Sequence, residues 1–436
     1  MAGFIRFFTI YAAGLNFDYK YFVIPMKSSV KLIARSRLLV SIVLLCSTAG
    51  VSMASNTENQ KVVSANTGFA FKLLNQLAKD QSGKNIFISP FGVSTVLQMT
   101  GSGAGGQTRM EMQQVLGTTA LPQTTLNEAN RYIYQALNRT DTNNVLTIAN
   151  ALWYQMGAPA KPDFIACNRQ YFGATIDALD FSSPHSVDVV NTWASEKTRG
   201  KISRIVSGPF DSNTRLYLAN AVYFKGKWME PFDKGSTKDR PFHLKSGEQK
   251  QVPMMEQSRK FTYRRGSGYQ AVRLWYEGYS VAMYVFLPDP GSSPEKLLSI
   301  MNGDKWDRVT LPGFEDRDGT IVLPKFKLEY GVDLNQPLKT MGMKTAFESG
   351  SGRVDFSGIS SRPLYISDVR QQTFIEVNEE GTEAAAATGM TILAGLETSP
   401  LPPPFKMIVD RPFLFLIADG QTGTILFMGT IYEPML

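Results

Sequence analysis

The 436-residue sequence contains little of the chemistry on which most enzymes depend. It has two histidines, His185 and His243, and neither lies in a recognisable catalytic motif. A Ser-His-Asp hydrolase needs a histidine held between its nucleophile and its acid, and the G-x-S-x-G elbow of many hydrolases is absent. Histidines and cysteines do not occur at metal-ligand spacing. The sequence therefore predicts a protein that is not an enzyme, with no catalytic residues, metal ion or cofactor.

Cysteine is equally scarce, with Cys46 near the N-terminus and Cys167 in the body of the chain. Loss of an N-terminal leader would leave Cys167 alone, so an internal disulfide is not expected. A large apolar core can replace disulfides even in an oxidising compartment. We interpret Cys167 as a buried small hydrophobe rather than a reactive thiol.

The first 54 residues have the order of a secretory signal peptide. Four basic residues precede an apolar run over 38–46, and small residues follow up to Ala54. Translation could begin at Met26, directly before the basic stretch. A membrane anchor is the alternative, but the apolar run is shorter than the ~20 residues of a span. Lipidation of Cys46 is a second alternative, disfavoured by Leu45 before it. We expect a secreted protein, extracellular or periplasmic, with no membrane contact after cleavage.

The chain's positive charge lies mostly in this leader. Residues 1–54 contain six lysines and arginines and one acidic residue, a net charge of +5. Because the whole chain carries +7, the remainder carries +2. A nucleic-acid partner, which requires a strongly basic surface, is therefore not expected.

Residues 55–436 contain neither a repeat nor a linker and are expected to form one domain. Helical periodicity covers 65–80, 94–99 and 108–116. Strand-like runs follow later in the chain, over 145–154, 217–224, 280–287, 319–330, 373–377, 405–419 and 423–432. Helices early and strands late indicate an α+β fold rather than repeating βαβ units.

Two short motifs match enzyme signatures but have simpler interpretations. The stretch 101–106 fits G-x-G-x-x-G, yet a helical pattern precedes it, which favours a helix-to-helix turn over a dinucleotide site. Ser293 and Lys296 fit S-x-x-K, but a serine followed by Pro294 is also an ordinary helix start.

A loop near the C-terminus differs from its surroundings. Residues 389–404 contain four prolines and no regular period, between two strong strand patterns. Prolines favour extended, solvated backbone, and ordered loops of this length usually have a function.

The segment before this loop suits two conformations. Glu379 and Glu380 precede Gly381, a hinge with free backbone angles. As a strand, the segment places small side chains on one face and Glu383 on the other, so that it could enter a packed sheet without steric cost. The small face comprises Thr382, Ala384, Ala386 and Thr388, and Ala385 and Ala387 alternate with it. Thr382→Arg would bury a charge and block such entry.

The segment 379–388 resembles the hinge of the reactive-centre loop in the serpin family. Other stretches resemble the family in the same order, so that the match extends from about residue 60 to the end. They are 85–90 (NIFISP), 191–193 (NTW), 220–228 (NAVYFKGKW), 252–255 (VPMM), 355–359 (DFSGI) and 409–415 (VDRPFLF). The chain departs from the family at Gln371, where many members have histidine, and at Gly92, where many have serine.

The resemblance implies three β-sheets, a shell of α-helices and an exposed reactive-centre loop over about 379–405. It also implies a metastable, monomeric suicide substrate, secreted and bacterial-like. A serine protease would attack the loop and form a covalent acyl complex, and the cut loop would insert into the central sheet. The alternative is a non-inhibitory member that acts as carrier, chaperone or storage protein, a group in which the small-residue hinge tends to be lost.

Family spacing places the reactive bond between Gly395 and Leu396, with Leu393 and Glu397 as alternatives. No lysine or arginine occurs between Ala384 and Phe405, which disfavours a trypsin-like target. Elastase-, subtilisin- or chymotrypsin-like proteases fit better, and Glu-specific ones remain open.

The resemblance further implies a region where the sheet opens. Glu379 would pair with Lys325, near Trp193, at the end of the sheet that receives the hinge. Ser89 and Asn220 would lie further along, where the strands part, together with Gln371.

Overall fold

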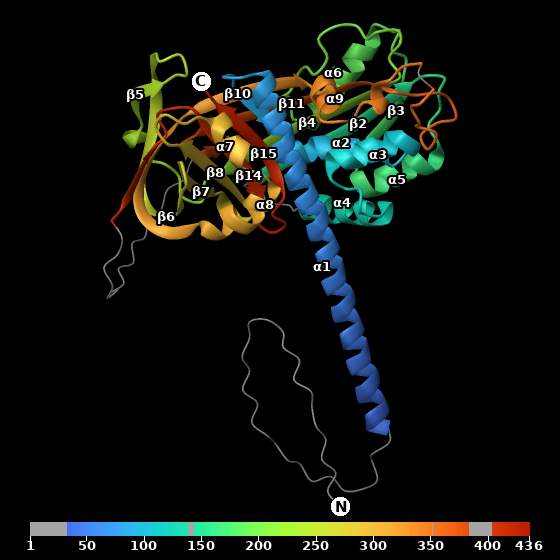
Figure 1. Cartoon of the computed structure of the whole chain (residues 1–436), viewed down its shortest axis with the longest axis horizontal. Helices are drawn as coiled ribbons and strands as arrows, with labels where there is room; N and C mark the ends of the chain where they lie inside the picture. Colours follow the sequence, from blue (N-terminus) through green and yellow to red (C-terminus); the bar gives the residue numbers. More distant parts are fainter. Residues whose placement is uncertain (1–32, 138–143, 351, 383–402) are drawn as a thin grey trace, which may run out of the picture. The chain divides into compact units, whose positions relative to one another are not determined.

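A computed structural model describes residues 33–137, 144–350, 352–382 and 403–436 (Figure 1). Internal contacts divide the chain into two units, Met1–Ser55 and Asn56–Leu436. The first unit is described only as the beginning of helix α1 (Ile33–Asp80). Across the described residues, no helix combines the length and apolarity needed to cross a membrane. The leader proposed for residues 1–54 stays a prediction.

The predicted helix over 65–80 ends where expected but begins much earlier, at Ile33. No proline occurs between Pro25 and Pro90, and most residues in this stretch are compatible with a helix. The predicted start at residue 65 marked where the apolar periodicity begins. A helix can extend beyond the part that has an apolar face.

The remaining helices of the second unit are short. They are α2 (Pro90–Gly101), α3 (Gly106–Leu116), α4 (Gln123–Leu137), α5 (Pro162–Phe172), α6 (His185–Lys197), α7 (Pro294–Ile300), α8 (Gly303–Lys305) and α9 (Asn335–Thr340), with single turns η1 (Lys234–Ser236), η2 (Glu277–Tyr279), η3 (Trp306–Thr310), η4 (Leu311–Gly313) and η5 (Thr345–Phe347). The stretch 101–106 joins α2 to α3, as predicted. The Ser293 side chain accepts a hydrogen bond from Lys296 N and caps α7, also as predicted.

One sheet has six strands in the order β10-β11-β12-β4-β2-β3. They are β10 (Phe326–Asp333), β11 (Ile366–Asn378), β12 (Gly381–Thr382), β4 (Leu216–Lys227), β2 (Asn144–Gln155) and β3 (Thr175–Leu179). Strands β11 and β4 run parallel, side by side, over 366–374 and 216–223. The sheet's inner face packs on α2 and the main core, and its outer face packs on α6 in a separate apolar cluster.

The second sheet has nine strands in the order β1-β15-β14-β8-β7-β6-β9-β13, with β5 paired to β6. They are β1 (Ile86–Ile88), β15 (Ile425–Ile431), β14 (Phe413–Asp419), β8 (Val281–Pro288), β7 (Tyr269–Trp275), β6 (Gln249–Gly266), β9 (Glu315–Pro324), β13 (Phe405–Ile408) and β5 (Lys238–His243). The long β6 pairs with β5, β7 and β9, so it joins two of the three expected sheets into one hydrogen-bonded network.

Two predicted strands are each split in the structure. The run 319–330 breaks at Lys325, where the chain passes from β9 in the nine-stranded sheet to β10 in the six-stranded sheet. The run 405–419 breaks between Ile408 and Phe413, where Pro412 cannot donate a ladder hydrogen bond. The α+β arrangement itself is confirmed.

Candidate functional site

The site forms where β11 turns back on itself to become β12. Gly381 pairs with Asn378 of β11 and with Lys227 of β4, and Thr382 pairs with Val377 and Gly226. These two residues therefore form a wedge that separates β11 from β4 at this end of the sheet, which we call the hinge end. Gly381 has φ +150°, and a Cβ there would overlap Gly226 O, so glycine is required at this position.

Thr382 is fully buried, with 0% of its surface exposed. Its Oγ1 lies 2.7 Å from the hydroxyl of Tyr276, and either group can donate the hydrogen bond. The Tyr276 ring stacks on Trp228 with centroids 4.5 Å apart and meets Phe224 edge-on at 4.9 Å. Burial raises the pKa of Tyr276 although the hydrogen bond with Thr382 opposes the rise. The first inward residue of the hinge thus occupies an aromatic cage with one polar contact.

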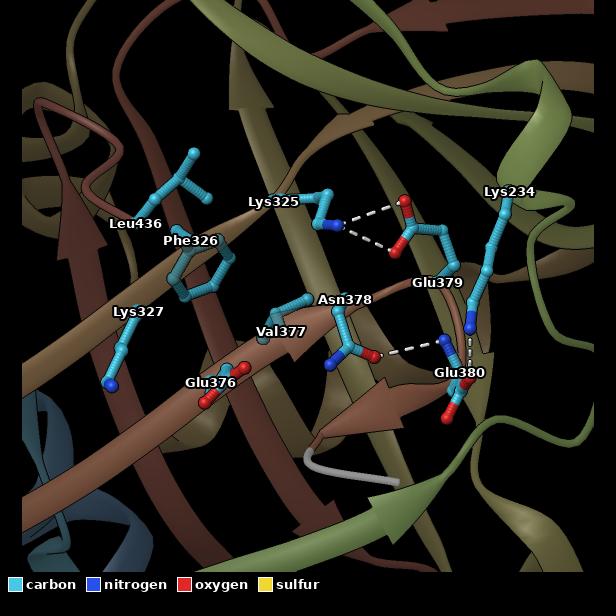
Figure 2. A pocket seen from close by; sticks show the side chains of 10 residues that line it. All are labelled: Lys234, Lys325, Phe326, Lys327, Glu376, Val377, Asn378, Glu379, Glu380 and Leu436. Atoms are coloured by element: carbon cyan, nitrogen blue, oxygen red, sulfur yellow. Dashed lines mark hydrogen bonds and ion pairs between the residues drawn. The ribbon is translucent and has the colours of Figure 1, made fainter. Parts of the chain in front are cut away.

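The turn between the two strands is held by an ion pair (Figure 2). Lys325 Nζ lies 2.9 Å from Glu379 Oε2, and Thr237 Oγ1 donates to Glu379 Oε1 at 2.8 Å. Burial by itself raises the pKa of Glu379, but the hydrogen bonds from Lys325 and Thr237 outweigh it and keep the pKa below its usual value. The expected pairing of Glu379 with Lys325 is present, while its role in opening the sheet stays a prediction.

Backbone contacts fix the same turn from the side of β4. Trp228 N donates to Glu380 O, and Trp228 Nε1 donates to Asn378 O, both at 2.9 Å. The Glu380 carboxylate also accepts a hydrogen bond from Lys234. These contacts hold both glutamates that precede Gly381.

An open cavity of about 770 Å³ lies beside this turn (Figure 2). Its ionisable side chains are Lys234, Lys325 and Lys327 together with Glu376, Glu379 and Glu380. The side-chain charges balance, and the described lining contains no serine, cysteine or histidine. Within the described part of the chain, no group of three histidine, cysteine or acidic residues could hold a metal ion.

The expected position of Trp193 is wrong. Trp193 lies on α6 and meets Trp153 edge-on at 5.2 Å, and Trp153 pairs with Tyr217 near the first residue of β4. The hinge turn lies beyond the last residue of β4, roughly 35 Å away at the usual rise per strand residue. The tryptophan at the turn is Trp228, which ends the family-like stretch 220–228 and lies directly after β4, four residues beyond the predicted strand 217–224.

Further along the sheet, Ser89, Asn220 and Gln371 meet in one buried polar network. Gln371 Oε1 accepts from Ser89 N at 3.0 Å, and its Nε2 donates to Ser89 O and to Asn220 Oδ1. Asn220 Nδ2 donates to Asn150 Oδ1 at 2.8 Å. Asn220 and Gln371 are direct partners in the β4–β11 pairing, so this network crosses the line along which the sheet would open.

The two departures from the family pattern, Gly92 and Gln371, meet in this network. A Cβ at Gly92 would overlap Asn220 Oδ1, the atom that accepts from Gln371. A serine at residue 92 would therefore displace the amide that Gln371 uses. We conclude that the residue types at positions 92 and 371 depend on each other through Asn220. Their separation in the sequence gave no indication of this.

The other predicted site residues lie outside the described residues. They are Glu383, Ala384, Ala385, Ala386, Ala387, Thr388, Leu393, Gly395, Leu396 and Glu397.

Cys167 is half-buried, and burial raises its pKa although a hydrogen bond from Asn127 opposes the rise, which disfavours a reactive thiolate.

Comparison with known proteins gives consistent results. A family model described as "Serpin (serine protease inhibitor)" matches residues 64–434. Leukocyte elastase inhibitor of Sus scrofa is 35% identical over 387 residues, covering 86% of this chain and 100% of that protein. Serpin B6 of Pongo abelii is 37% identical over 379 residues, covering 85% and 98%. The structure of human thyroxine-binding globulin with thyroxine has a TM-score of 0.77 at 26% identity, covering 87% and 100%.

Gly92→Ser should destabilise the intact protein by about 1–3 kcal/mol, because the added Cβ displaces Asn220 from its network. Serine has a higher helix propensity than glycine, so propensity alone would make α2 more stable in this variant, not less. Urea unfolding of intact protein measures the effect. Gly208→Ser, where a Cβ meets no atom within 4 Å, is the matched control. Equal midpoints for both variants would contradict the coupling.

Lys325→Met should lower the melting temperature at pH 7 and matter less at acid pH. The pKa of Glu379 is lower in the folded protein than in the unfolded chain, where it is near 4.5. The ion pair therefore stabilises the fold fully above the unfolded pKa, and this stabilisation is lost as pH falls through the folded pKa. Melting curves at pH 7 and pH 4 test this. Lys327→Met removes a lysine of the same cavity that has no ion pair with Glu379, and its effect should not depend on pH in this way. A pH-independent deficit in Lys325→Met would contradict the argument.

Proposed function

Because this chain belongs to the serpin family, we propose that it inhibits serine proteases as a suicide substrate, trapping the acyl-enzyme by insertion of its cleaved loop. The observation that carries the proposal is the wedge of Gly381 and Thr382 between β11 and β4. A third strand has begun to form between two strands that are otherwise neighbours. The rest of the segment 379–388 has only to continue the strand that these two residues start.

The observed pairs set the register of that continuation. Each further residue moves one position along β4 and one along β11, antiparallel to both. Ala384 would lie opposite Phe224 and Ile375, and Thr388 opposite Asn220 and Gln371. Directly opposed residues share a face, so the four small residues that begin with Thr382 all face the inner core. The inner neighbours are fully buried, which explains why only small side chains would be admitted.

This register leads the inserting strand through the polar network. Thr388 would arrive between Asn220 and Gln371, whose side chains are now hydrogen bonded to each other. Insertion therefore has to break that bond and can replace it with bonds to the threonine hydroxyl. The small polar Thr388 therefore matches the amide pair on its path, while Ala386 would lie opposite Val222 and Thr373, whose hydroxyl already donates to Phe87 O.

The energy gained by insertion is large on the scale of protein stability. A full strand adds on the order of 10–20 backbone hydrogen bonds at roughly 1 kcal/mol net each, less those lost between β11 and β4. Whole domains are stable by about 5–15 kcal/mol. Insertion can therefore supply enough free energy to distort an attached protease, if it outruns deacylation.

The register also relates the position of the reactive bond to the end of the inserted strand. Ile392 would lie opposite Leu216, the first residue of β4, so the strand ends there. A bond between Gly395 and Leu396 lies three residues beyond, which leaves a short tether for the acylated protease. The absence of lysine and arginine from this part of the loop supports elastase-, subtilisin- or chymotrypsin-like targets, as does similarity to a leukocyte elastase inhibitor.

A carrier role is the second candidate, because thyroxine-binding globulin shares the fold. A carrier has no need of a hinge that fits the sheet. The small-residue segment and the seated Thr382 therefore favour inhibition. We also propose that the protein is exported, on the basis of the basic, apolar and small-residue order of residues 27–54.

Wild-type protein should form a complex with one of these proteases that survives a denaturing gel, and mass spectrometry of the released peptide should identify the cut bond. Ala384→Arg should abolish the complex while the loop is still cut, because the arginine would face Phe224 and Ile375 in the core. Glu383→Arg is the matched control, since its side chain would face outward beside the half-buried Lys225 and Glu376. If Ala384→Arg traps protease as well as Glu383→Arg does, the insertion mechanism is wrong.

A further inference from the structure

The proposed insertion does not itself require Tyr276, yet the Tyr276 hydroxyl is hydrogen bonded to the hinge residue Thr382. The hydrogen bond between Tyr276 and Thr382 lies in the aromatic cage of Trp228 and Phe224, and both hydroxyl-bearing residues are fully buried. Tyr276 follows directly after β7, in the nine-stranded sheet. The contact therefore joins the second sheet to the first residue that would insert into the other.

If the hinge left the sheet, the Thr382 hydroxyl would gain a new hydrogen-bond partner and the Tyr276 hydroxyl would not. Thr382 would move into solvent and find water as a partner. Tyr276 would stay beneath the sheet in apolar surroundings, and its hydroxyl would lose the partner that the structure gives it. A buried hydroxyl without a partner is costly, so Tyr276 favours the state in which Thr382 is seated.

We propose that Tyr276 is a positioning residue for inhibition, which keeps Thr382 seated so that insertion extends an existing strand in a fixed register. This inference rests on the proposed function. Strand pairing has a period of two, and a slip of one residue would turn the small face outward. With Thr382 unseated, the cut loop would first have to find its entry and register, while the acyl-enzyme hydrolyses.

This role differs from a simple contribution to stability. Thr382 meets Tyr276 before cleavage, and in the register above it keeps the same place after full insertion. Loss of the hydrogen bond should therefore destabilise the intact and the inserted forms alike. The driving force of insertion would stay the same, while the starting point of insertion would change.

A double-mutant cycle tests whether the hydroxyl pair seats the hinge. Tyr276→Phe and Thr382→Val each remove one hydroxyl and keep the shape, and the double variant removes both. Amide hydrogen exchange of the peptide containing residues 381–382 should be about tenfold faster in Tyr276→Phe, where the seated Thr382 hydroxyl has no partner. It should be close to wild type in Thr382→Val and in the double variant, where the seated valine needs no partner. Tyr330→Phe is the control, because Tyr330 lies on β10 and its hydroxyl donates to Gln81 Oε1, not to the hinge. Unchanged exchange in Tyr276→Phe would overturn the proposal.

The second measurement is the stoichiometry of inhibition, the number of inhibitor molecules consumed for each protease trapped. It should rise severalfold in Tyr276→Phe and return toward the wild-type value in the double variant. Melting temperatures of the cleaved forms should keep the same distance from the intact forms in wild type and variants. If Tyr276→Phe traps protease as well as or better than wild type, the contact restrains the loop or is neutral, and the positioning role is wrong.

The proposed function and the positioning role of Tyr276 can fail separately. If wild-type protein is cut by each protease of the panel without a stable complex, the proposed function is wrong. The exchange experiment requires no protease, so it decides independently whether Tyr276 seats Thr382.

Discussion

The pairing of β11 with β4 is the constraint on which the rest of the structure depends. The two strands are parallel neighbours over most of their length, and at the hinge end they already lie on either side of β12. A sheet that is closed along one stretch and wedged apart at its end has a defined line along which it can open. The ion pair of Glu379, the cage around Thr382 and the network at Asn220 all lie on that line.

Much of the fold could be predicted from the sequence, because buried strands appear as apolar runs and helices as periodic ones. The predicted boundaries failed at Ile33, where α1 begins well before the apolar periodicity of 65–80, and at Lys325, where one apolar run passes from β9 in one sheet to β10 in the other. The ion pair between Lys325 and Glu379 joins residues 54 apart, and only resemblance to a family suggested it. The sequence showed the small-residue hinge as a pattern, but not that its first residue is already seated.

The residues that sequence reasoning missed have a common property. Trp228 and Tyr276 lie at the ends of apolar strands, where an aromatic residue looks like any other core residue. Their importance comes from what their polar atoms meet, Asn378 O and the Thr382 hydroxyl, and such partners are distant in the chain. Gly92 is similar, since its lack of a side chain matters only because Asn220 lies against it.

Under the proposed insertion, the register that β12 starts divides the loop into two parts under different evolutionary limits. Between Gly381 and the position opposite Leu216, the number of residues is fixed by the depth of the sheet, and gaining or losing one would turn the following side chains over. Beyond that point the sheet sets no count before β13 begins at Phe405. On that mechanism, related chains could lengthen or shorten this second part, which contains the prolines and the proposed reactive bond, and acquire new targets without changes to the inserting part.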